Sequence, residues 1–285
     1  MSGIKIKPSS DAIGAEILGV DLSIDLNDAS LDAIQRAWQT HLVLIFRNQS
    51  LSKRELVRFS SRLGVLDLAP NDRFGQMLVD GYPELAIISN IEEDGRPIGG
   101  LGNAEAVWHT DMSYNEIPPK ASALYSIEVP PTGGNTGFLN MYAAYNALPV
   151  NLRAELAGRK LKHDSTHNSV YELRQGMEIP IDLTTSPGAV HPIVCTHPDS
   201  DKKALFLGRR KYSYVLGLSV QQSELLLDRV WTHCVNQRFY WHHQWRVGDL
   251  VLWDNRCVMH QREPFDSSYR RLMIRTQIQG NRPKQ

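Results

Sequence analysis

Short apolar runs dominate the hydrophobic pattern of the chain and predict β-strands. Four other segments repeat apolar residues at helical spacing and predict helices near 30–42, 52–63, 149–158 and 219–234. Ser52 with Glu55, and Ser219 with Gln222, form capping boxes at two of the helix starts. Many short strands with a few helices favour a mainly β fold, a double-sheet antiparallel barrel with helices packed outside. The predicted strands cover 42–46, 84–89, 121–129, 136–142, 203–208, 238–245, 249–254 and 270–278.

The length and composition of the chain indicate one domain. The 285 residues are 42 % hydrophobic, which is enough to bury one sizeable core. The sequence contains no internal repeat, no low-complexity tract and no long Gly/Ser linker that would mark a boundary. We therefore expect a single domain over residues 1–285.

Charge and cysteine content narrow the function classes. Lysine plus arginine equals aspartate plus glutamate at 31 each, so no net field attracts nucleic acid or a membrane surface. The N-terminus lacks the apolar region of a signal peptide, and no apolar run approaches the length of a membrane span. The three cysteines, which lack any C-x-x-C spacing, read as small buried hydrophobes in a reducing compartment. We expect a soluble cytoplasmic protein without a nucleic-acid or membrane partner.

The stretch AVWHTDMSY places His109 and Asp111 two residues apart. If they lie on a strand or at its end, a period of two directs both side chains to one face, where they could bind one metal ion. By itself, however, the spacing is more often incidental than a site. A facial triad of two histidines and one carboxylate, which binds Fe(II), requires a distant second histidine.

His260 is the best candidate for that third ligand. It follows DLVLWDNRCVM, an apolar strand ending in an Asp-Asn turn that would return the next strand along the barrel. His242 and His243 lie in an alternating aromatic strand and are better explained by packing. His167 is kept as a possible substrate-side residue.

An arginine pair follows His260 along the chain. Arg271 lies in SYRRLMIRTQI, and an arginine buried on a barrel strand is costly unless it meets an anion. Either Arg270 or Arg271 must point outward, since neighbours on a strand face opposite sides. Arg275, four positions after Arg271, would share its face. Two inward arginines would suit a dicarboxylate cosubstrate and an acidic primary substrate.

With these residues in place, the chain resembles the taurine dioxygenase family, the branch of Fe(II)/2-oxoglutarate-dependent oxygenases that includes 2,4-dichlorophenoxyacetate dioxygenases. The resemblance runs along nearly the whole chain. The matching stretches are IGAEILGVDLS, VLIFRNQSLS, WHTDMSY, PPTGGNTGFLNMYAAYNALP, HPIVCTHPDSDKKALFLG, WRVGDLVLWDNRCVMHQR and RRLMIRTQIQG. It implies a double-stranded β-helix, which is a jelly-roll barrel. It also implies Fe(II), 2-oxoglutarate and O2, with succinate and CO2 as coproducts of a substrate hydroxylation.

The resemblance also implies residue roles. His109, Asp111 and His260 match the iron ligands. Thr136 and Arg271 match the residues that bind the distal carboxylate of 2-oxoglutarate. Without the resemblance, Thr136 would be an ordinary β-branched strand residue after a Gly-Gly turn. Arg275 matches the position that meets the acidic head of the substrate in taurine-type members.

The sequence departs from the taurine-specific pattern where the substrate is chosen. Taurine-specific members carry a histidine just after the turn that corresponds to FSSRLGVLDLAP, where this chain offers Asp67 and Ala69. This departure argues against taurine itself. Arg209 and Arg210 lie after a short apolar strand, where they either form a solvated rim or clamp an anionic substrate. We expect a small organic acid such as a sulfonate or phenoxyalkanoate, with further contacts from residues 112–114.

Other outcomes stay open at this level. The same iron site could catalyse desaturation, cyclisation or epimerisation. The triad could also hold zinc in a non-oxidative enzyme, although zinc gives no reason for a dicarboxylate-binding pair at Thr136 and Arg271. Relatives in the family are commonly dimers or tetramers, so the resemblance also implies a homo-oligomer.

Overall fold

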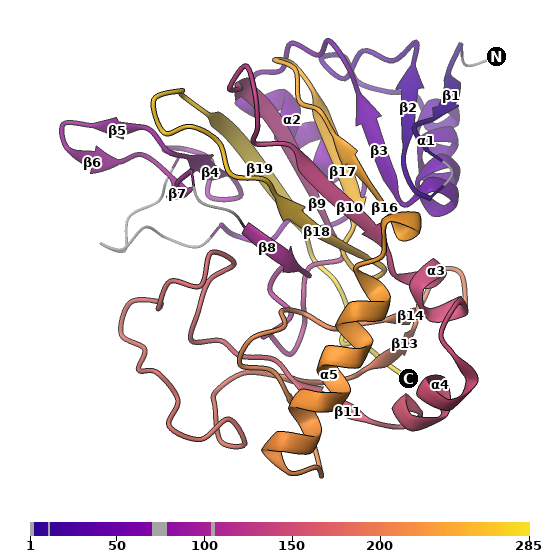
Figure 1. Cartoon of the computed structure of the whole chain (residues 1–285). Coiled ribbons are helices and arrows are strands. Elements are labelled where there is room, and N and C mark those ends of the chain that lie inside the picture. Colours follow the sequence, from indigo (N-terminus) through magenta and orange to yellow (C-terminus); the bar gives the residue numbers. More distant parts are fainter. Residues whose placement is uncertain (1–2, 11, 70–78, 104–105) are drawn as a thin grey trace.

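Two β-sheets that face each other form the centre of the computed structural model (Figure 1). The structure describes residues 3–10, 12–69, 79–103 and 106–285. The larger sheet has the order β1 (Lys5–Pro8), β2 (Ala15–Leu18), β3 (Val43–Phe46), β17 (Leu250–Asp254), β9 (Ala121–Glu128), β19 (Leu272–Ile278), β4 (Ala86–Ser89) and β7 (Gly100–Leu101). The smaller sheet has the order β16 (Tyr240–His243), β10 (Thr136–Asn140), β18 (Val258–Arg262) and β8 (Ala106–His109).

The remaining elements surround these two sheets. Small sheets are formed by β12 (Val190–Pro192) with β11 (Lys160–Lys162) and β15 (Tyr214–Val215), by β13 (Val194–Thr196) with β14 (Lys203–Leu205), and by β5 (Glu92–Glu93) with β6 (Arg96–Pro97). The helices are α1 (Asp28–His41), α2 (Lys53–Ser61), α3 (Met141–Asn146), α4 (Val150–Leu156) and α5 (Val220–Cys234), with a 3-10 turn at Gln237–Phe239. The prediction of a mainly β fold with flanking helices is confirmed.

Strands β3 and β17 of the larger sheet are apolar on both faces. On β3, Val43 and Ile45 join the core between the two sheets, whereas Leu44 and Phe46 join the core under α1 and α2. Side chains alternate across a strand, so a continuous apolar run is what a sheet covered on both faces requires. Burial of both faces makes the larger sheet a rigid wall for the space between the sheets.

The helix signals read from the sequence are present as capping interactions. Ser52 and Glu55 form both hydrogen bonds of a capping box at the start of α2, and Ser219 and Gln222 do so at the start of α5. Each box satisfies backbone N–H groups that the first helical turn leaves unpaired. These two helices therefore begin where the sequence predicted.

The strand predicted over 136–142 is two residues too long. The strand predicted over 136–142 ends at Asn140, because the Asn140 side chain accepts hydrogen bonds from the backbone N–H groups of Tyr142 and Ala143. An asparagine that caps in this way starts a helix, and α3 follows directly. The apolar run of NMYAAY carried no period that separates a strand end from a short helix.

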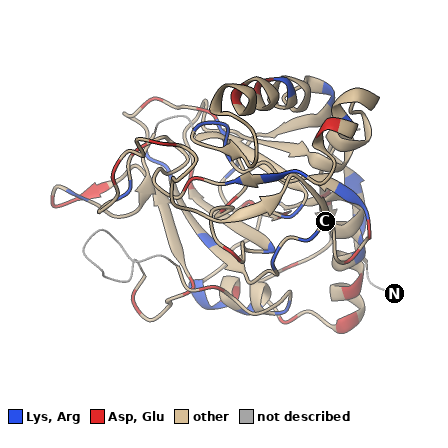
Figure 2. Cartoon of the chain, turned by 90° about the horizontal axis from the view of Figure 1, so that it is seen from below, with Lys and Arg blue, Asp and Glu red and all other residues tan. Residues whose placement is uncertain are grey.

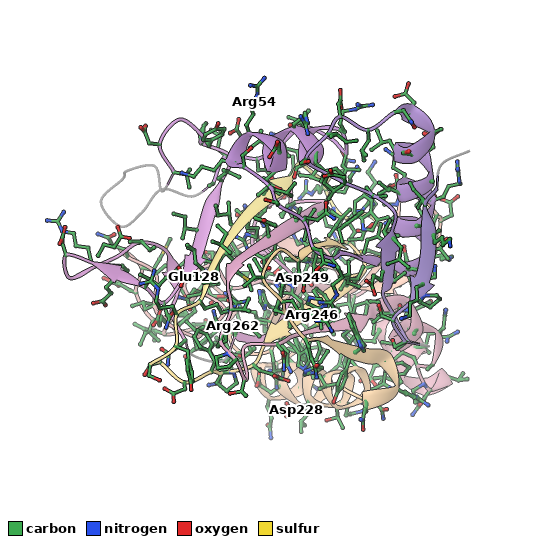
Figure 3. The ribbon with its side chains drawn as sticks, turned by 90° about the horizontal axis from the view of Figure 1, so that it is seen from above. Arg54, Glu128, Asp228, Arg246, Asp249 and Arg262 are labelled. Atoms are coloured by element: carbon green, nitrogen blue, oxygen red, sulfur yellow. The ribbon has the colours of Figure 1, made fainter. Side chains whose placement is uncertain are left out.

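Charged residues of both signs are interspersed along the ribbon in Figure 2, in keeping with the zero net charge. Figure 3 places Arg54 and Asp228 at the outer edge of the molecule and Asp249 within the packed interior. Asp249 is fully buried, and its carboxylate lies 3.1 Å from the buried His243 ring, so His243 has a structural role in the interior.

All three cysteines are buried and unpaired, as predicted. No helix among the described residues is long and apolar enough to cross a membrane.

Candidate metal centre and active site

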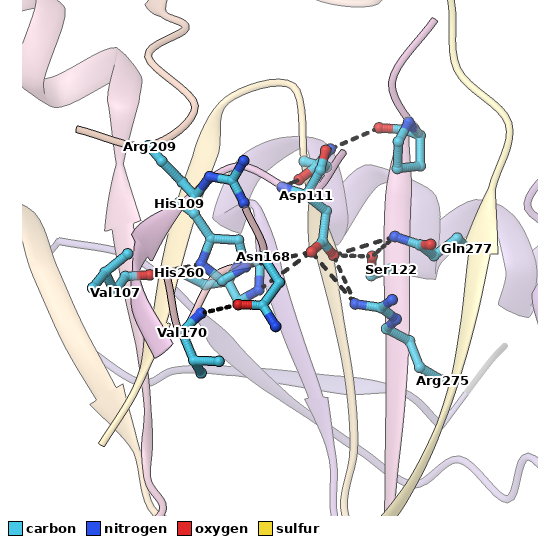
Figure 4. Close-up of polar contacts among 12 residues, drawn as sticks. Val107, His109, Asp111, Ser122, Asn168, Val170, Arg209, His260, Arg275 and Gln277 are labelled. Atoms are coloured by element: carbon cyan, nitrogen blue, oxygen red, sulfur yellow. Dashed lines mark hydrogen bonds and ion pairs between the residues drawn. The ribbon is translucent and has the colours of Figure 1, made fainter. Parts of the chain in front are cut away.

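His109, Asp111 and His260 converge at one end of the space between the sheets. His109 is the last residue of β8 and lies directly opposite His260 on β18. Asp111 Oδ1 is 3.5 Å from His109 Nε2 and 3.8 Å from His260 Nε2, and all three residues are buried (Figure 4). The structure thus brings together the two-residue pair and the histidine 149 positions beyond Asp111.

The hydrogen bonding of His109 leaves one ring nitrogen available. Its Nδ1 lies 2.7 Å from the carbonyl oxygen of Val107, which can only accept, so Nδ1 donates. In the neutral ring this tautomer leaves the lone pair on Nε2, the atom that faces Asp111. A ligand histidine held by a backbone carbonyl in this way is the usual support of a metal site.

The charges of the cluster suit a cation. Burial alone would raise the pKa of Asp111, but Arg275 and the two histidines hold it well below its usual range, so the carboxylate is ionised. Burial, with His109 nearby, lowers the pKa of His260 to about 3, so its ring is neutral. A neutral His260 and an ionised Asp111 can bind a divalent metal without first losing protons.

A large cavity opens beside the three residues. Its volume is about 1200 Å³, and residues of both sheets and of the 168–175 segment line it. Met112, Ser113 and Tyr114, where further substrate contacts are expected, are among the lining residues. Three acidic residues line the described part of the cavity, against six arginines: Arg96, Arg174, Arg209, Arg262, Arg271 and Arg275. This excess of cations favours anionic ligands.

Arg271 is buried in the cavity wall, and two of its guanidinium nitrogens lack a hydrogen-bond acceptor among the described residues. Its side chain is 2 % exposed, and Nε and Nη1 have no hydrogen-bond partner among the described residues. Burial, together with the neighbouring Arg262, lowers the pKa of Arg271 to about 9. A buried guanidinium in this state is stabilised by a carboxylate ligand. Thr136 lines the same cavity, and its Oγ1 accepts from Trp245 Nε1 at 2.9 Å, which leaves the hydroxyl hydrogen free to donate.

Arg275 also lies in the cavity, but it already has a partner. Its Nη1 is 3.3 Å from Asp111 Oδ2 and 3.4 Å from Oδ1. Arg275 on β19 and Arg271, the residue before β19, both line the cavity, while Arg270 points outward and binds Glu128. This alternation is the one the sequence predicted, and Arg271 is the inward residue of the pair.

The two arginines predicted at the cavity mouth have different positions. Arg209 lines the cavity, but its Nη groups are occupied by the carbonyl oxygens of His167 and Asp164. Arg210 does not line the cavity: it binds Glu224 at 2.9 Å and Asp228 at 2.6 Å on α5. The prediction of Arg210 as a substrate clamp is therefore not supported by its position, because two carboxylates already neutralise it.

Arg174 lines the cavity, although the sequence analysis did not predict it as a site residue. Its guanidinium lies 4.1 Å from the centre of the Tyr114 ring, and its only hydrogen bond within the described residues runs from Nε to the His167 carbonyl oxygen. Both Nη groups are thus available to a ligand. Only the folded position of the 168–175 segment over the cavity reveals this residue, since no local motif surrounds it.

Other residues considered from the sequence lie away from the cavity. His167 is buried, bonded to Thr166 and stacked on Tyr212 with 4.1 Å between ring centres. Asp67 and Ala69 do not line the described part of the cavity. The end of the FSSRLGVLDLAP stretch, at residue 70, is outside the described residues.

A second group of possible ligands, His197, Asp254 and Cys257, does not suit a metal ion. Both carboxylate oxygens of Asp254 accept from Arg256, at 2.9 and 2.6 Å, and Oδ2 also meets His197. The guanidinium already provides the positive charge that a metal would bring. This group is therefore a structural ion pair.

Two histidines and one carboxylate, open on one side to a cavity rich in arginine, form the ligand set of non-haem Fe(II) oxygenases. Sequence comparison agrees with this class: residues 5–277 match the "Taurine catabolism dioxygenase TauD, TfdA family". The chain belongs to this family and is an α-ketoglutarate-dependent dioxygenase, α-ketoglutarate being 2-oxoglutarate.

Individual relatives cover almost the whole chain. It is 35 % identical over 277 residues to alpha-ketoglutarate-dependent 2,4-dichlorophenoxyacetate dioxygenase of Cupriavidus pinatubonensis, covering 94 % of this chain and 95 % of the relative. It is 30 % identical to alpha-ketoglutarate-dependent sulfate ester dioxygenase of Pseudomonas putida, covering 98 % and 91 %.

Solved structures show the same arrangement of the chain. A taurine dioxygenase from Burkholderia xenovorans superposes with a TM-score of 0.78 at 31 % identity, over 98 % of this chain and 92 % of that one. AAD-2 in complex with Mn(II) and N-oxalylglycine superposes with a TM-score of 0.79 at 28 % identity, over 99 % of both chains.

Proposed function

We propose that this dioxygenase uses Fe(II) held by His109, Asp111 and His260 to hydroxylate a small anionic organic acid, with succinate and CO2 as coproducts. One observation carries the proposal. The three possible ligands converge at the same cavity in which the buried guanidinium of Arg271 lacks an acceptor. A metal site and a carboxylate site in one cavity are what a metal-dependent enzyme with a dicarboxylate cosubstrate needs.

Each side chain has a role that follows from its chemistry. His109 and His260 offer ring nitrogens and Asp111 offers an ionised oxygen to the iron. Arg271 and Thr136 bind the distal carboxylate of 2-oxoglutarate, the arginine by charge and two N–H donors and the threonine by its free hydroxyl hydrogen. Iron bound here with 2-oxoglutarate and O2 supplies the oxidising chemistry.

The protein orients the metal ligands and excludes water from the space around them. Phe138 and Trp253 lie against the His260 ring, with 6.4 and 4.8 Å between ring centres, and both are buried. Apolar rings behind a ligand histidine exclude water and fix its orientation. Phe138 comes from β10 of the smaller sheet and Trp253 from β17 of the larger sheet, so both sheets provide apolar walls of low dielectric around His260.

The charge of the cavity supports an anionic primary substrate. Arg275 and Arg174 are the arginines best placed to meet it, Arg275 beside the metal site and Arg174 at the wall formed with Tyr114. Arg209 contributes positive charge while tied to backbone carbonyls. Relatives whose names specify 2,4-dichlorophenoxyacetate and sulfate esters support the class of phenoxyalkanoates, sulfonates and related acids.

Membership of the dioxygenase family also supports proposals about the barrel topology, the domain organisation and the location of the protein. We propose that the facing sheets form a double-stranded β-helix, a jelly-roll barrel, and that residues 1–285 act as one domain, because both sheets line one cavity. Three buried free cysteines support a cytoplasmic location. A homo-oligomer, dimer or tetramer, stays a prediction.

Alternative outcomes differ in how well the cavity supports them. Desaturation, cyclisation or epimerisation would use the same residues as hydroxylation. Identification of the reaction product distinguishes these reactions. A zinc-dependent non-oxidative enzyme is less well supported, because it leaves the buried guanidinium of Arg271 without a role.

The test is to add Fe(II) and 2-oxoglutarate to the protein without air and record the visible spectrum. We expect the weak absorption band that the two give together, and, in air with a panel of acids, succinate release. His109→Ala and Asp111→Ala should remove both signals while the far-UV circular dichroism spectrum is retained. A metal-loaded wild-type protein without the band would contradict the proposal.

A further inference from the structure

The backbone of Asp111 is fixed by a side chain from a distant turn. Asp111 lies two residues beyond the end of β8, so strand pairing does not hold it. Asn255, in the turn between β17 and β18, accepts from the Asp111 N–H at 2.8 Å and donates to its carbonyl oxygen at 2.9 Å. The turn that leads to His260 therefore also places Asp111.

The two carboxylate oxygens of Asp111 have different surroundings (Figure 4). Oδ1 is the oxygen that faces the two histidines, at 3.5 and 3.8 Å. Oδ2 accepts from Ser122 Oγ at 2.8 Å and from Gln277 Nε2 at 3.3 Å, and it also meets Arg275. Oδ2 thus has three donors, whereas Oδ1 faces the possible metal position and has the longer of the two Arg275 contacts, at 3.4 Å.

Ser122 and Gln277 act from directly opposite positions on two neighbouring strands. They are cross-strand partners on β9 and β19, both are buried, and Gln277 Nε2 also lies 3.3 Å from Ser122 Oγ. A pair held in a central sheet cannot follow a rotating carboxylate. The hydrogen bonds therefore fix the plane of the Asp111 carboxylate.

We propose that Ser122 and Gln277 are positioning residues that make Asp111 bind the metal through Oδ1 alone. The inference rests on the proposed function, because it concerns the metal that Asp111 would hold. A carboxylate free to rotate could bind through both oxygens and occupy a position that the facial triad keeps open. Partners of ligating carboxylates affect metal affinity by about 10- to 100-fold in other metal sites.

The experiment compares Ser122→Ala with Ser126→Ala. Both serines are fully buried on the same face of β9, but the Ser126 hydroxyl donates to the Arg246 carbonyl oxygen at 2.6 Å and does not touch Asp111. Metal-free full-length protein is titrated with Mn²⁺ and followed by electron paramagnetic resonance. The absorption spectrum of the Co²⁺-loaded protein reports the geometry of the site.

We expect Ser122→Ala to weaken Mn²⁺ binding by about tenfold or more and to change the Co²⁺ spectrum, whereas Ser126→Ala keeps the wild-type values. Gln277→Leu should weaken binding by a smaller factor, because its hydrogen bond is longer. Folding is checked by circular dichroism, and if Ser122→Ala does not fold, Gln277→Leu provides the test.

Two results would overturn the inference, and they are distinguishable. Wild-type Mn²⁺ affinity and an unchanged Co²⁺ spectrum in a folded Ser122→Ala or, failing that, Gln277→Leu protein would remove the positioning role alone. A wild-type protein that binds no Mn²⁺ would overturn the proposed metal site, and this inference with it.

Discussion

Arg270 and Arg271, the two residues that precede β19, have opposite surroundings, although the sequence presents them as a pair. Arg270 is exposed and pairs with Glu128, whereas Arg271 is buried with two nitrogens lacking an acceptor. The strand period decides which one faces the cavity. The cost of burying Arg271 is offset only when an anion binds, so its energetics belong to ligand binding.

Arg271→Gln should weaken 2-oxoglutarate binding by about tenfold to a hundredfold, because a hydrogen-bonded charge is worth roughly 1.5–3 kcal/mol. Titration of the visible band of the Fe(II) protein measures the change. Arg270→Gln is the matched control and should leave the binding unchanged. Equal effects of the two changes would contradict the assignment of Arg271.

Arg174→Gln should raise the KM for the best acid of the panel by about tenfold, since it removes one charged donor pair from the cavity wall. Succinate release measures the effect, and 2-oxoglutarate binding should not change.

Arg275→Gln should raise the KM for the same acid and also weaken metal binding, because Arg275 contacts Asp111. Arg210→Gln, at a residue paired on α5, should change neither quantity.

The elements around the cavity meet through closely packed glycines. Gly208, just after β14, has a φ of +65°, and its carbonyl oxygen accepts from the Thr110 N–H at 3.2 Å. A Cβ at this position would lie 2.2 Å from His163 Nδ1 and 2.5 Å from Ser113 Oγ. Gly208 therefore supports the segment between His109 and Asp111 by allowing close approach.

Gly208→Ala should lower the free energy of unfolding more than Gly217→Ala does. Gly217 has a similar φ of +81° but nothing within 4 Å of an added Cβ, so it reports the backbone strain alone, about 1 kcal/mol. The clash at Gly208 should add about 1–3 kcal/mol. Urea unfolding of the three proteins measures both effects, and equal losses would contradict the packing role.

At the scale of the whole molecule, buried histidines link stability to pH. Burial, with His191 and Arg209 nearby, holds the pKa of His163 well below the ordinary value of 6.5. The unfolded chain takes up a proton below pH 6.5 that the folded protein excludes. The stability that neutral His163 permits is thus fully present above pH 6.5 and is lost as the pH falls below it.

His163→Phe should reduce this pH dependence. For the wild-type protein, one such histidine removes about 1.4 kcal/mol of unfolding free energy at pH 5.5 relative to pH 7.5. Urea unfolding of both proteins at the two pH values isolates the contribution, since the other histidines are common to both. Identical losses in the two proteins would show that His163 is not excluded from protonation in the fold.

The sequence by itself determined the elements whose signals are local. The capping boxes fixed the starts of α2 and α5, and apolar runs located the central strands, because hydrogen bonds and side-chain periodicity act within a few residues. The family resemblance assigned His109, Asp111, His260, Thr136 and Arg271 to one site, and all five residues line the cavity.

Only the tertiary structure determined which side chains from distant parts of the sequence contact one another. It separated Arg209 from Arg210, brought Arg174 over the Tyr114 ring, and set Ser122 opposite Gln277 behind Asp111. These contacts join segments far apart in the chain, and no local pattern encodes which distant groups will neutralise a charge or accept a hydrogen bond. The packing of the 168–175 segment, of α5 and of the paired strands β9 and β19 against their neighbours makes those choices.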